Sequence, residues 1–175
     1  MTGVQTCALP ISYYYTTTLK PFVYGIPIAI VFSWLNLILI SLLAVKFFFK
    51  NIKPSVQALI SASIILSLDI MLEPFASKVN NFWLWEFQKI PLQNYLCWFV
   101  FGFFFSYFIN KAILWNEEYF ANRNHSMIPL ILLAVNLLNF AVINILNGYI
   151  FSVTIGLVLF FIMFLFSIRT RKIAS

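Results

Sequence analysis

Charge and histidine are scarce in this chain of 175 residues. Only 9% of the residues are charged, five are acidic and one is histidine. A soluble domain carries about 25% charged residues, so a chain this apolar cannot cover a soluble globule with polar surface. A single histidine argues against membrane di-iron hydroxylases, desaturases and ketolases, which bind their metals through many imidazoles. The net charge of +6 is spread over loop ends, so we expect no nucleic acid as a partner.

The motifs of several other enzyme classes are also missing. There is no paired Asp-rich motif to hold magnesium and a diphosphate, no Gly-rich dinucleotide loop before a helix, and no Ser–His arrangement for hydrolysis. The two cysteines, Cys7 and Cys97, form neither a disulfide framework nor a metal-binding pair. These absences favour an acid–base reaction that needs no cofactor and no metal.

Long hydrophobic runs fill most of the chain. Hydrophobic residues make up 62% of it, and the mean hydropathy is +0.94. Five segments come close to the roughly 20 residues that cross a bilayer as a helix. We therefore predict an all-α fold: a polytopic transmembrane helix bundle, forming one membrane domain over residues 12–175, in the lipid bilayer of a bacterial or archaeal cytoplasmic membrane. The five expected spans are residues 26–48, 55–76, 92–114, 127–146 and 149–168.

The first eleven residues, MTGVQTCALPI, differ from the rest. From Thr2 to Ile11 they match the translation of a common sequencing adapter, and they lack the basic start and long apolar core of a secretory signal. We expect residues 1–11 to be artefactual and the native sequence to start near Ser12. The chain is then N-terminally truncated, with one or more upstream helices missing.

The basic residues predict the orientation in the membrane. Cytoplasmic loops carry an excess of Lys and Arg, and most basic residues here fall on the side that also holds the C-terminus. We therefore expect the C-terminus in the cytoplasm and Ser12 outside. The larger group is Lys46, Lys50, Lys53, Lys111, Arg123, Arg169, Arg171 and Lys172, against Lys20, Lys78 and Lys89 on the other side.

Two acids, Asp69 and Glu73, lie near the end of the second expected span. A charged carboxylate in the centre of a bilayer costs at least about 2.5 kcal/mol, so acids inside spans are functional candidates by default. Their i, i+4 spacing places both on one helical face, where two acids share a proton and divide their roles. We predict a catalytic acid pair. The alternative is that they cap a helix end or pair with Lys78 at the interface.

Other polar and aromatic residues are expected at the same depth, near the outer leaflet. Tryptophan faces would stabilise a cation, and Asn94 and Asn139 would hold water. The alternatives are that Trp83 and Trp85 form an interfacial belt and that Asn139 joins helices. The predicted substrate-binding residues are Trp34, Asn36, Trp83, Trp85, Asn94, Trp98 and Asn139.

The order of several short motifs resembles a known family. They are Tyr13-Tyr14-Tyr15-Thr16, Gly25-Ile26-Pro27, Trp34, Asp69-x-x-x-Glu73-Pro74, Trp83-x-Trp85, Pro91-Leu92-x-Asn94-Tyr95 and Trp98-Phe99. Together they resemble the integral-membrane carotenoid biosynthesis proteins, which include carotenoid 1′,2′-hydratases and bisanhydrobacterioruberin hydratase. The resemblance covers Tyr13 to about Tyr107. It departs at Cys97, where the family usually has Gly, and that difference concerns helix packing.

The resemblance implies a cofactor-independent hydratase, a carbon–oxygen lyase, that adds water to the terminal double bond of a linear carotenoid end group. Its partners would be the linear carotenoid, water and other enzymes of the carotenoid pathway. Such a reaction starts with protonation, and a carboxyl group in apolar surroundings can stay protonated at neutral pH. The alternatives are a lycopene cyclase-like isomerase that excludes water, and a non-enzymatic membrane transporter or scaffold. A transporter is expected to show internal repeats and broken helices, and the sequence shows neither.

Overall fold

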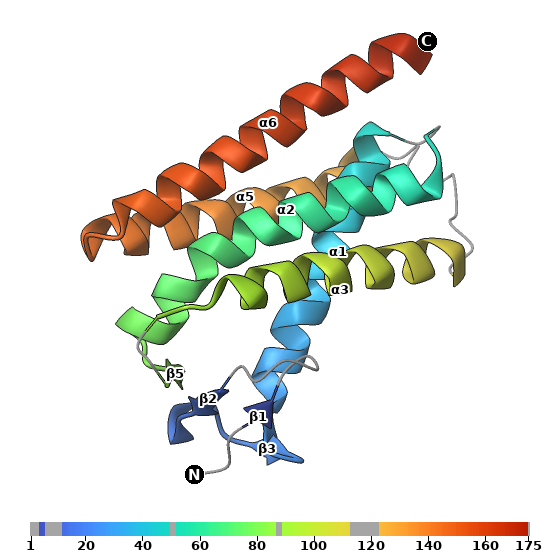
Figure 1. Ribbon diagram of the computed structural model, residues 1–175. Helices are drawn as coiled ribbons and strands as arrows, with labels where there is room; N and C mark the ends of the chain where they lie inside the picture. Colours follow the sequence, from blue (N-terminus) through green and yellow to red (C-terminus); the bar gives the residue numbers. More distant parts are fainter. Residues whose placement is uncertain (1–3, 6–11, 50–51, 87–88, 113–122, 175) are drawn as a thin grey trace.

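The computed structural model describes residues 4–5, 12–49, 52–86, 89–112 and 123–174. Long helices account for most of these residues, as expected for an all-α membrane bundle (Figure 1). The long helices are α1 Ile28–Phe48, α2 Pro54–Pro74, α3 Leu92–Ala112, α5 Arg123–Leu146 and α6 Ile150–Ala174.

In the described part of the chain, four helical stretches are long and apolar enough to cross a membrane, as predicted for an all-α membrane bundle. They are Ile28–Phe48, Pro54–Val79, Leu92–Ala112 and Met127–Leu146. The fifth expected span corresponds to α6, in which the apolar stretch found among the fully described residues is Ile150–Ile162. Residues 113–114, at the end of the third expected span, lie outside the described residues.

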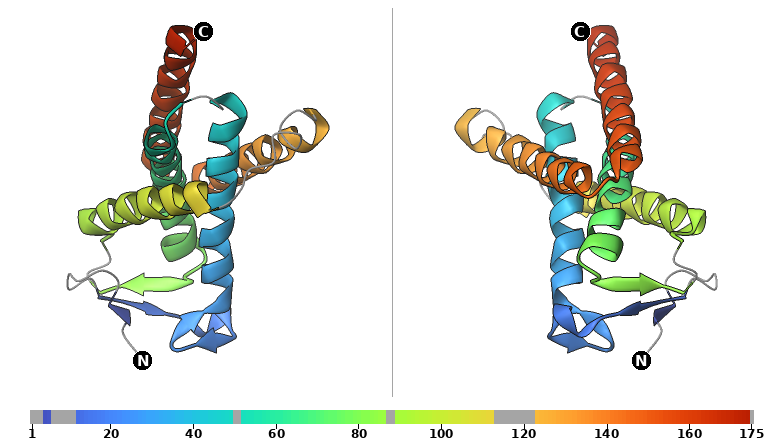
Figure 2. Two further views of the ribbon diagram at one scale, coloured as in Figure 1. Left: turned by 90° about the vertical axis from the view of Figure 1, so that its right-hand side faces the viewer. Right: turned by 90° about the vertical axis from the view of Figure 1, so that its left-hand side faces the viewer.

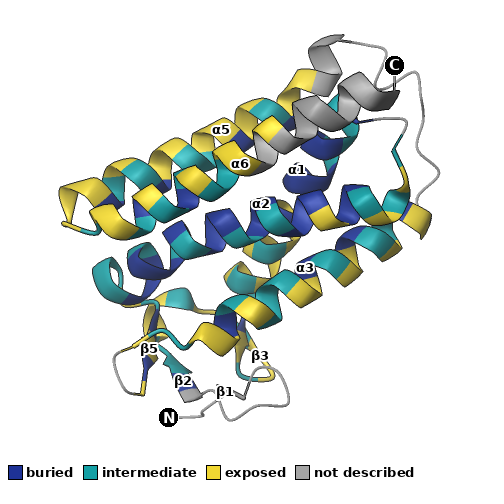
Figure 3. Cartoon of the chain, turned by 45° about the horizontal axis from the view of Figure 1, so that its top comes forward, coloured by how far each residue is buried: buried dark blue, intermediate teal, exposed yellow. Residues whose placement is uncertain are grey.

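Helix α2 is the centre of the bundle, because α1, α3, α5 and α6 all contact it. Helices α3 and α5 extend to opposite sides of α1 and α2 (Figure 2). Most of α2 is buried, whereas α3, α5 and α6 carry exposed faces (Figure 3). Large apolar side chains such as Phe104, Phe108 and Leu138 are exposed there, as expected for surfaces that face lipid.

Two glycines allow helices to approach α2 closely. A Cβ added at Gly156 of α6 would come within 2.4 Å of Met71 Cγ and 3.0 Å of the Ser67 carbonyl oxygen. At Gly102 of α3, an added Cβ would lie 3.1 Å from Ile65 Cδ1. Helices in a membrane gain no hydrophobic driving force from association, because lipid tails are as apolar as the side chains. Close packing drives association instead, and small residues at the interface allow it.

We expect Gly156→Leu to destabilise the protein by about 1–3 kcal/mol, because the added side chain overpacks the α2–α6 interface. Thermal unfolding in detergent measures this loss. Met71→Ala removes the nearest clashing atoms, so the double variant should recover part of it. Val158→Phe, which also adds four side-chain carbons but at an exposed position of α6, should have little effect. Equal stability of Gly156→Leu and the unchanged protein would contradict this packing.

Short strands, which the sequence analysis did not predict, form at one end of the bundle. Strands β1 Val4–Gln5, β2 Ser12–Tyr15 and β5 Trp83–Trp85 form one antiparallel sheet in the order β1-β2-β5. Strands β3 Phe22–Val23 and β4 Ile26–Pro27 form a hairpin just before α1. The strands lie where α1 begins, near the end of α2 and the start of α3 (Figure 1).

The end of α2 directs the chain into β5. Proline has no N–H to continue the helical ladder, and after Pro74 the helix widens into the π-helical turn η2, Phe75–Val79. The N–H of Phe82 donates to the Ala76 carbonyl at 2.8 Å, and the N–H of Thr16 donates to the Phe82 carbonyl at 3.0 Å. These bonds hold β5 and β2 directly below the end of α2.

Helix α5 is fixed to the same part of α2. The Asn144 side chain, fully buried, donates from Nδ2 to the Met71 carbonyl oxygen at 2.6 Å. Met71 lies midway between the two acids in sequence, so this bond anchors α5 beside them. Asn144 therefore joins two helices, which is one of the uses of asparagine inside membranes.

Candidate active site

Three N–H groups converge on the buried carboxyl group of Glu73, which is 2% exposed. Trp83 Nε1 and Trp85 Nε1 donate to Oε2 at 3.2 and 3.1 Å. Asn94 Nδ2 donates to Oε1 at 2.9 Å. The two indoles reach the same oxygen because residues i and i+2 of a strand point to the same face. Strand β5 and helix α3 thus hold the acid in one orientation.

The network continues from Asn94 to α1. Trp98, one helical turn after Asn94 on α3, donates from Nε1 to Asn94 Oδ1 at 3.1 Å. Its ring stacks on that of Trp34 in α1, with 3.4 Å between centroids and an interplanar angle of 11°. A chain of contacts therefore links Glu73 of α2 to β5, α3 and α1.

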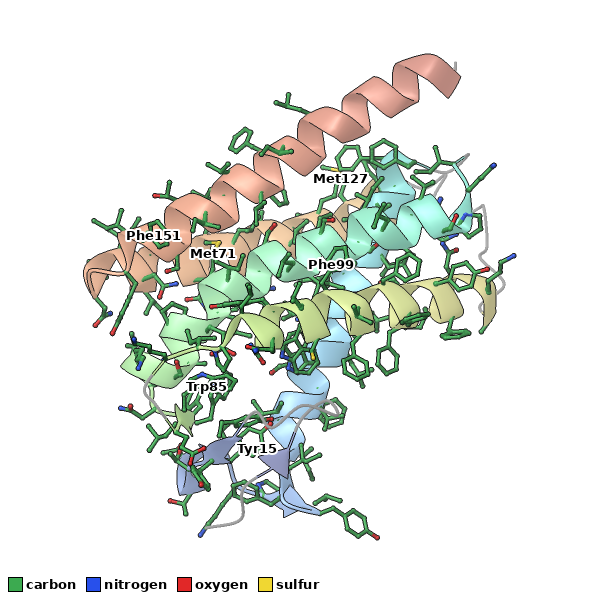
Figure 4. All side chains as sticks on the ribbon, in the orientation of Figure 1. Tyr15, Met71, Trp85, Phe99, Met127 and Phe151 are labelled. Carbon is green, nitrogen blue, oxygen red and sulfur yellow. The ribbon has the colours of Figure 1, made fainter. Side chains whose placement is uncertain are left out.

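A layer of tyrosines from β2 covers the two indoles. Tyr13 pairs with Trp85 and Tyr15 with Trp83 across the strands, at centroid distances of 5.1 and 6.4 Å. The two tyrosine hydroxyls lie 2.9 Å apart. Burial raises the pKa of the Tyr15 phenol above its ordinary value, and Tyr13 and then Glu73 raise it further. Tyr15 therefore stays neutral. Figure 4 shows Tyr15 and Trp85 at this end of the molecule.

The carboxyl group of Asp69 has different surroundings. It is 1% exposed, and neither oxygen accepts a hydrogen bond from any described residue. It interacts electrostatically with Glu73, and the Tyr95 phenol of α3 interacts with both acids. An unpaired buried polar group costs about 1–3 kcal/mol, so each one in a native protein calls for an explanation such as a catalytic role.

A cavity of about 250 Å³ lies on the α1 and α5 side of η2. Four of the predicted site residues line it: Trp34, Asn36, Trp83 and Asn139. Ser33 and Asn136 add polar groups to this amide-lined cavity, and its apolar wall is formed by residues such as Leu72, Phe75 and Phe140. The acids are not among its lining residues. Trp83 connects the cavity to Glu73, because it lines the first and donates to the second.

Comparison with known protein families identifies the family of this chain. The family model described as carotenoid biosynthesis protein matches residues 1–163. The chain belongs to the carotenoid biosynthesis protein family. No curated protein and no solved structure was found to match it. The match includes every predicted site residue and supports a role of this membrane protein in carotenoid biosynthesis.

In this family member, each predicted site residue except Asp69 belongs to the Glu73 network or lines the amide-lined cavity. Asp69 interacts electrostatically with Glu73 and accepts no hydrogen bond from the described residues. Trp83 and Trp85 are 7% and 6% exposed, so their burial favours a role in the site over an interfacial belt. Asn94 was expected to hold water, but its amide nitrogen and oxygen are engaged by Glu73 and Trp98. We now assign Asn94 to positioning Glu73.

Sequence reasoning missed Tyr13, Tyr15 and Tyr95 as neighbours of the acids. Tyr13 and Tyr15 share the i, i+2 spacing of Trp83 and Trp85, and two such aromatic pairs are a signal for cross-strand pairing. The sequence contains this signal, but the long hydrophobic spans dominated the prediction. In the described part of the chain, no three His, Cys, Asp or Glu side chains gather as they would around a metal ion.

Proposed function

We propose that this carotenoid biosynthesis protein is a hydratase that adds water to the terminal double bond of a linear carotenoid end group. The main support is the difference in hydrogen bonding between its two buried acids. Glu73 accepts three hydrogen bonds, and Asp69 accepts none from the described residues. Two carboxyl groups whose surroundings differ in this way are suited to opposite parts of an acid–base reaction.

Asp69 is the proposed proton donor. Hydrogen bonds from N–H groups favour an ionised carboxylate, and Glu73 has three of them. Asp69 lacks such bonds among the described residues, so its neutral, proton-bearing form suits its apolar surroundings. Its O–H proton is transferred to the less substituted alkene carbon, which leaves a tertiary carbocation and an Asp69 carboxylate.

Glu73 and nearby aromatic rings are proposed to stabilise the cation. A fixed carboxylate one turn from the donor opposes the positive charge as it develops. The rings of Trp34 and Trp98 stack next to the Glu73 network, since Trp98 also donates to Asn94, and aromatic faces attract cations. Water then adds to the cation through its oxygen, and the proton that it loses returns to Asp69.

The amide-lined cavity is the proposed source of this water. Ser33, Asn36, Asn136 and Asn139 line it, and Leu19 and Phe82 place one wall next to the strands at the end of the bundle. With the orientation predicted from the basic residues, this end lies at the outer surface. The hydroxyl and amide groups in this lining favour water capture over the lycopene cyclase-like isomerisation, which uses the same acids but must keep water away.

Pigment analysis tests the proposal. A host that makes linear carotenes and expresses the chain is expected to form a new pigment that is more polar and heavier by one water. Liquid chromatography and mass spectrometry detect this pigment. An isomer of unchanged mass would instead identify a cyclase-like enzyme. Unchanged pigments, with the protein present in the membrane, would reject both reactions and leave a transporter or scaffold.

A further inference from the structure

A second hollow lies on the opposite face of α2 from the amide-lined cavity. It is a groove of about 550 Å³ between α2, α3 and α6, within the usual size range of ligand sites. Its lining is apolar apart from the Tyr95 and Ser152 hydroxyl groups. The other lining residues are Leu66, Ile70, Leu92, Leu96, Phe99, Phe151 and Ile155.

The rim of this groove, which we call the apolar groove, faces the lipid. Leu96 of α3 and Phe151 of α6 are 58% and 78% exposed, and both belong to helices expected in the membrane. Phe99 on α3 and Phe151 on α6 lie on either side of α2 in Figure 4. A hydrophobic molecule dissolved in the bilayer would reach this groove without crossing water.

The apolar groove adjoins the acid pair. Leu66 and Ile70 line it and are three residues before and one residue after Asp69 on α2. Asp69 is not itself a lining residue, but it lies within one helical turn of both. Tyr95 lines the groove and also interacts electrostatically with Asp69 and Glu73. Leu72, three residues after Asp69, lines the amide-lined cavity instead. The α2 segment that carries the acids therefore lies between the apolar groove and a cavity that also holds hydroxyl and amide groups.

We propose that the apolar groove binds the polyene of the linear carotenoid, which enters from the bilayer and brings its end group to Asp69 past Tyr95. This inference rests on the proposed function. It accounts for one apolar hollow and one hollow with hydroxyl and amide groups near the same acid pair, since hydration needs one reactant from lipid and one from water. A saturated acyl chain would suit the lining, but it has no double bond to protonate. Protonating the disubstituted double bond of an unsaturated acyl chain would give a secondary cation, which is less stable than the tertiary cation of a carotenoid end group. The aromatic rings of Tyr95 and Phe99 suit a rigid conjugated chain.

The test measures the carotene retained by the full chain when it is purified in mild detergent from a carotene-producing host. Ser152→Trp fills the groove from α6. Thr154→Trp is the matched control, because Thr154 is exposed on the same helix. In the described part of the chain, each hydroxyl donates to a nearby backbone carbonyl, Ser152 to Tyr149 just before α6 and Thr154 to Ile150. We expect Ser152→Trp to lower retained carotene per protein at least about fivefold, and Thr154→Trp to leave it unchanged.

A second pair of variants covers the case in which Ser152→Trp does not fold. Leu96→Trp fills the groove from α3, and Val100→Trp, exposed one turn further on, is its control. Unchanged carotene in folded groove variants, equal losses in groove and control variants, or loss of bound phospholipid instead of carotene would each overturn the proposal. Carotene retained at the groove without any hydrated product would reject the hydratase reaction and still support this binding site.

Discussion

Asp69→Asn is expected to lower the yield of hydrated carotenoid by about 10²–10⁴-fold, the usual contribution of a general acid. The amide has nearly the same shape as the carboxyl group but cannot give a proton to an alkene. Because Asp69 accepts no hydrogen bond from the described residues, the variant should fold and unfold at nearly the same temperature as the unchanged protein. Pigment yield and thermal unfolding in detergent measure the two effects.

Glu73→Gln is the informative comparison. The Gln amide brings N–H donors into a site where Trp83, Trp85 and Asn94 already donate, so it should reduce both yield and stability. Glu86→Gln makes the same chemical change at an exposed position and should alter neither. Full activity of Asp69→Asn would eliminate Asp69 as the proton donor, and the reaction would then need another acid.

The two acids could be recognised from the sequence because of the free-energy cost of placing a carboxylate inside a membrane span. In a chain with five acidic residues, two at i, i+4 inside an apolar span require a local reason. The same logic predicted the spans, since hydrophobic length determines them. Depth in the membrane also predicted which tryptophans and asparagines would lie at the level of the acids. Of these, Trp83, Trp85 and Asn94 contact Glu73, whereas Asn36 and Asn139 line the amide-lined cavity.

The contacts themselves could not be predicted. Depth does not determine whether Trp83 faces headgroups or Glu73; the register of β5 against β2 does, and short strands give little sequence signal beside long spans. Asn94 illustrates the same limit, because its role depends on which groups face its amide. The positions of the two hollows depend on how α1, α3, α5 and α6 surround α2, which requires three-dimensional packing.

The indole donors should be energetically coupled to Glu73. Trp85→Phe removes one N–H from the acid but keeps an aromatic ring in its place, and a hydrogen bond to a charged group contributes about 1.5–3 kcal/mol. In a chain that already carries Glu73→Leu, the Trp85 N–H has no carboxyl group to donate to. There, Trp85→Phe should lower the free energy of unfolding much less. The difference, about 1–3 kcal/mol, is measured by a double-mutant cycle from detergent unfolding.

Phe82→Leu supplies the control for this cycle. Phe82 lies beside Trp83 in the chain and packs edge-on against Phe75 at 6.1 Å between centroids, but it has no polar atom to offer Glu73. Phe82→Leu should therefore lower the free energy of unfolding by the same amount with and without Glu73→Leu. If Trp85→Phe were equally additive, the indoles would serve only to fill space. Coupling confined to the indole would instead show that β5 holds Glu73 as the fixed charge that the proposed reaction requires.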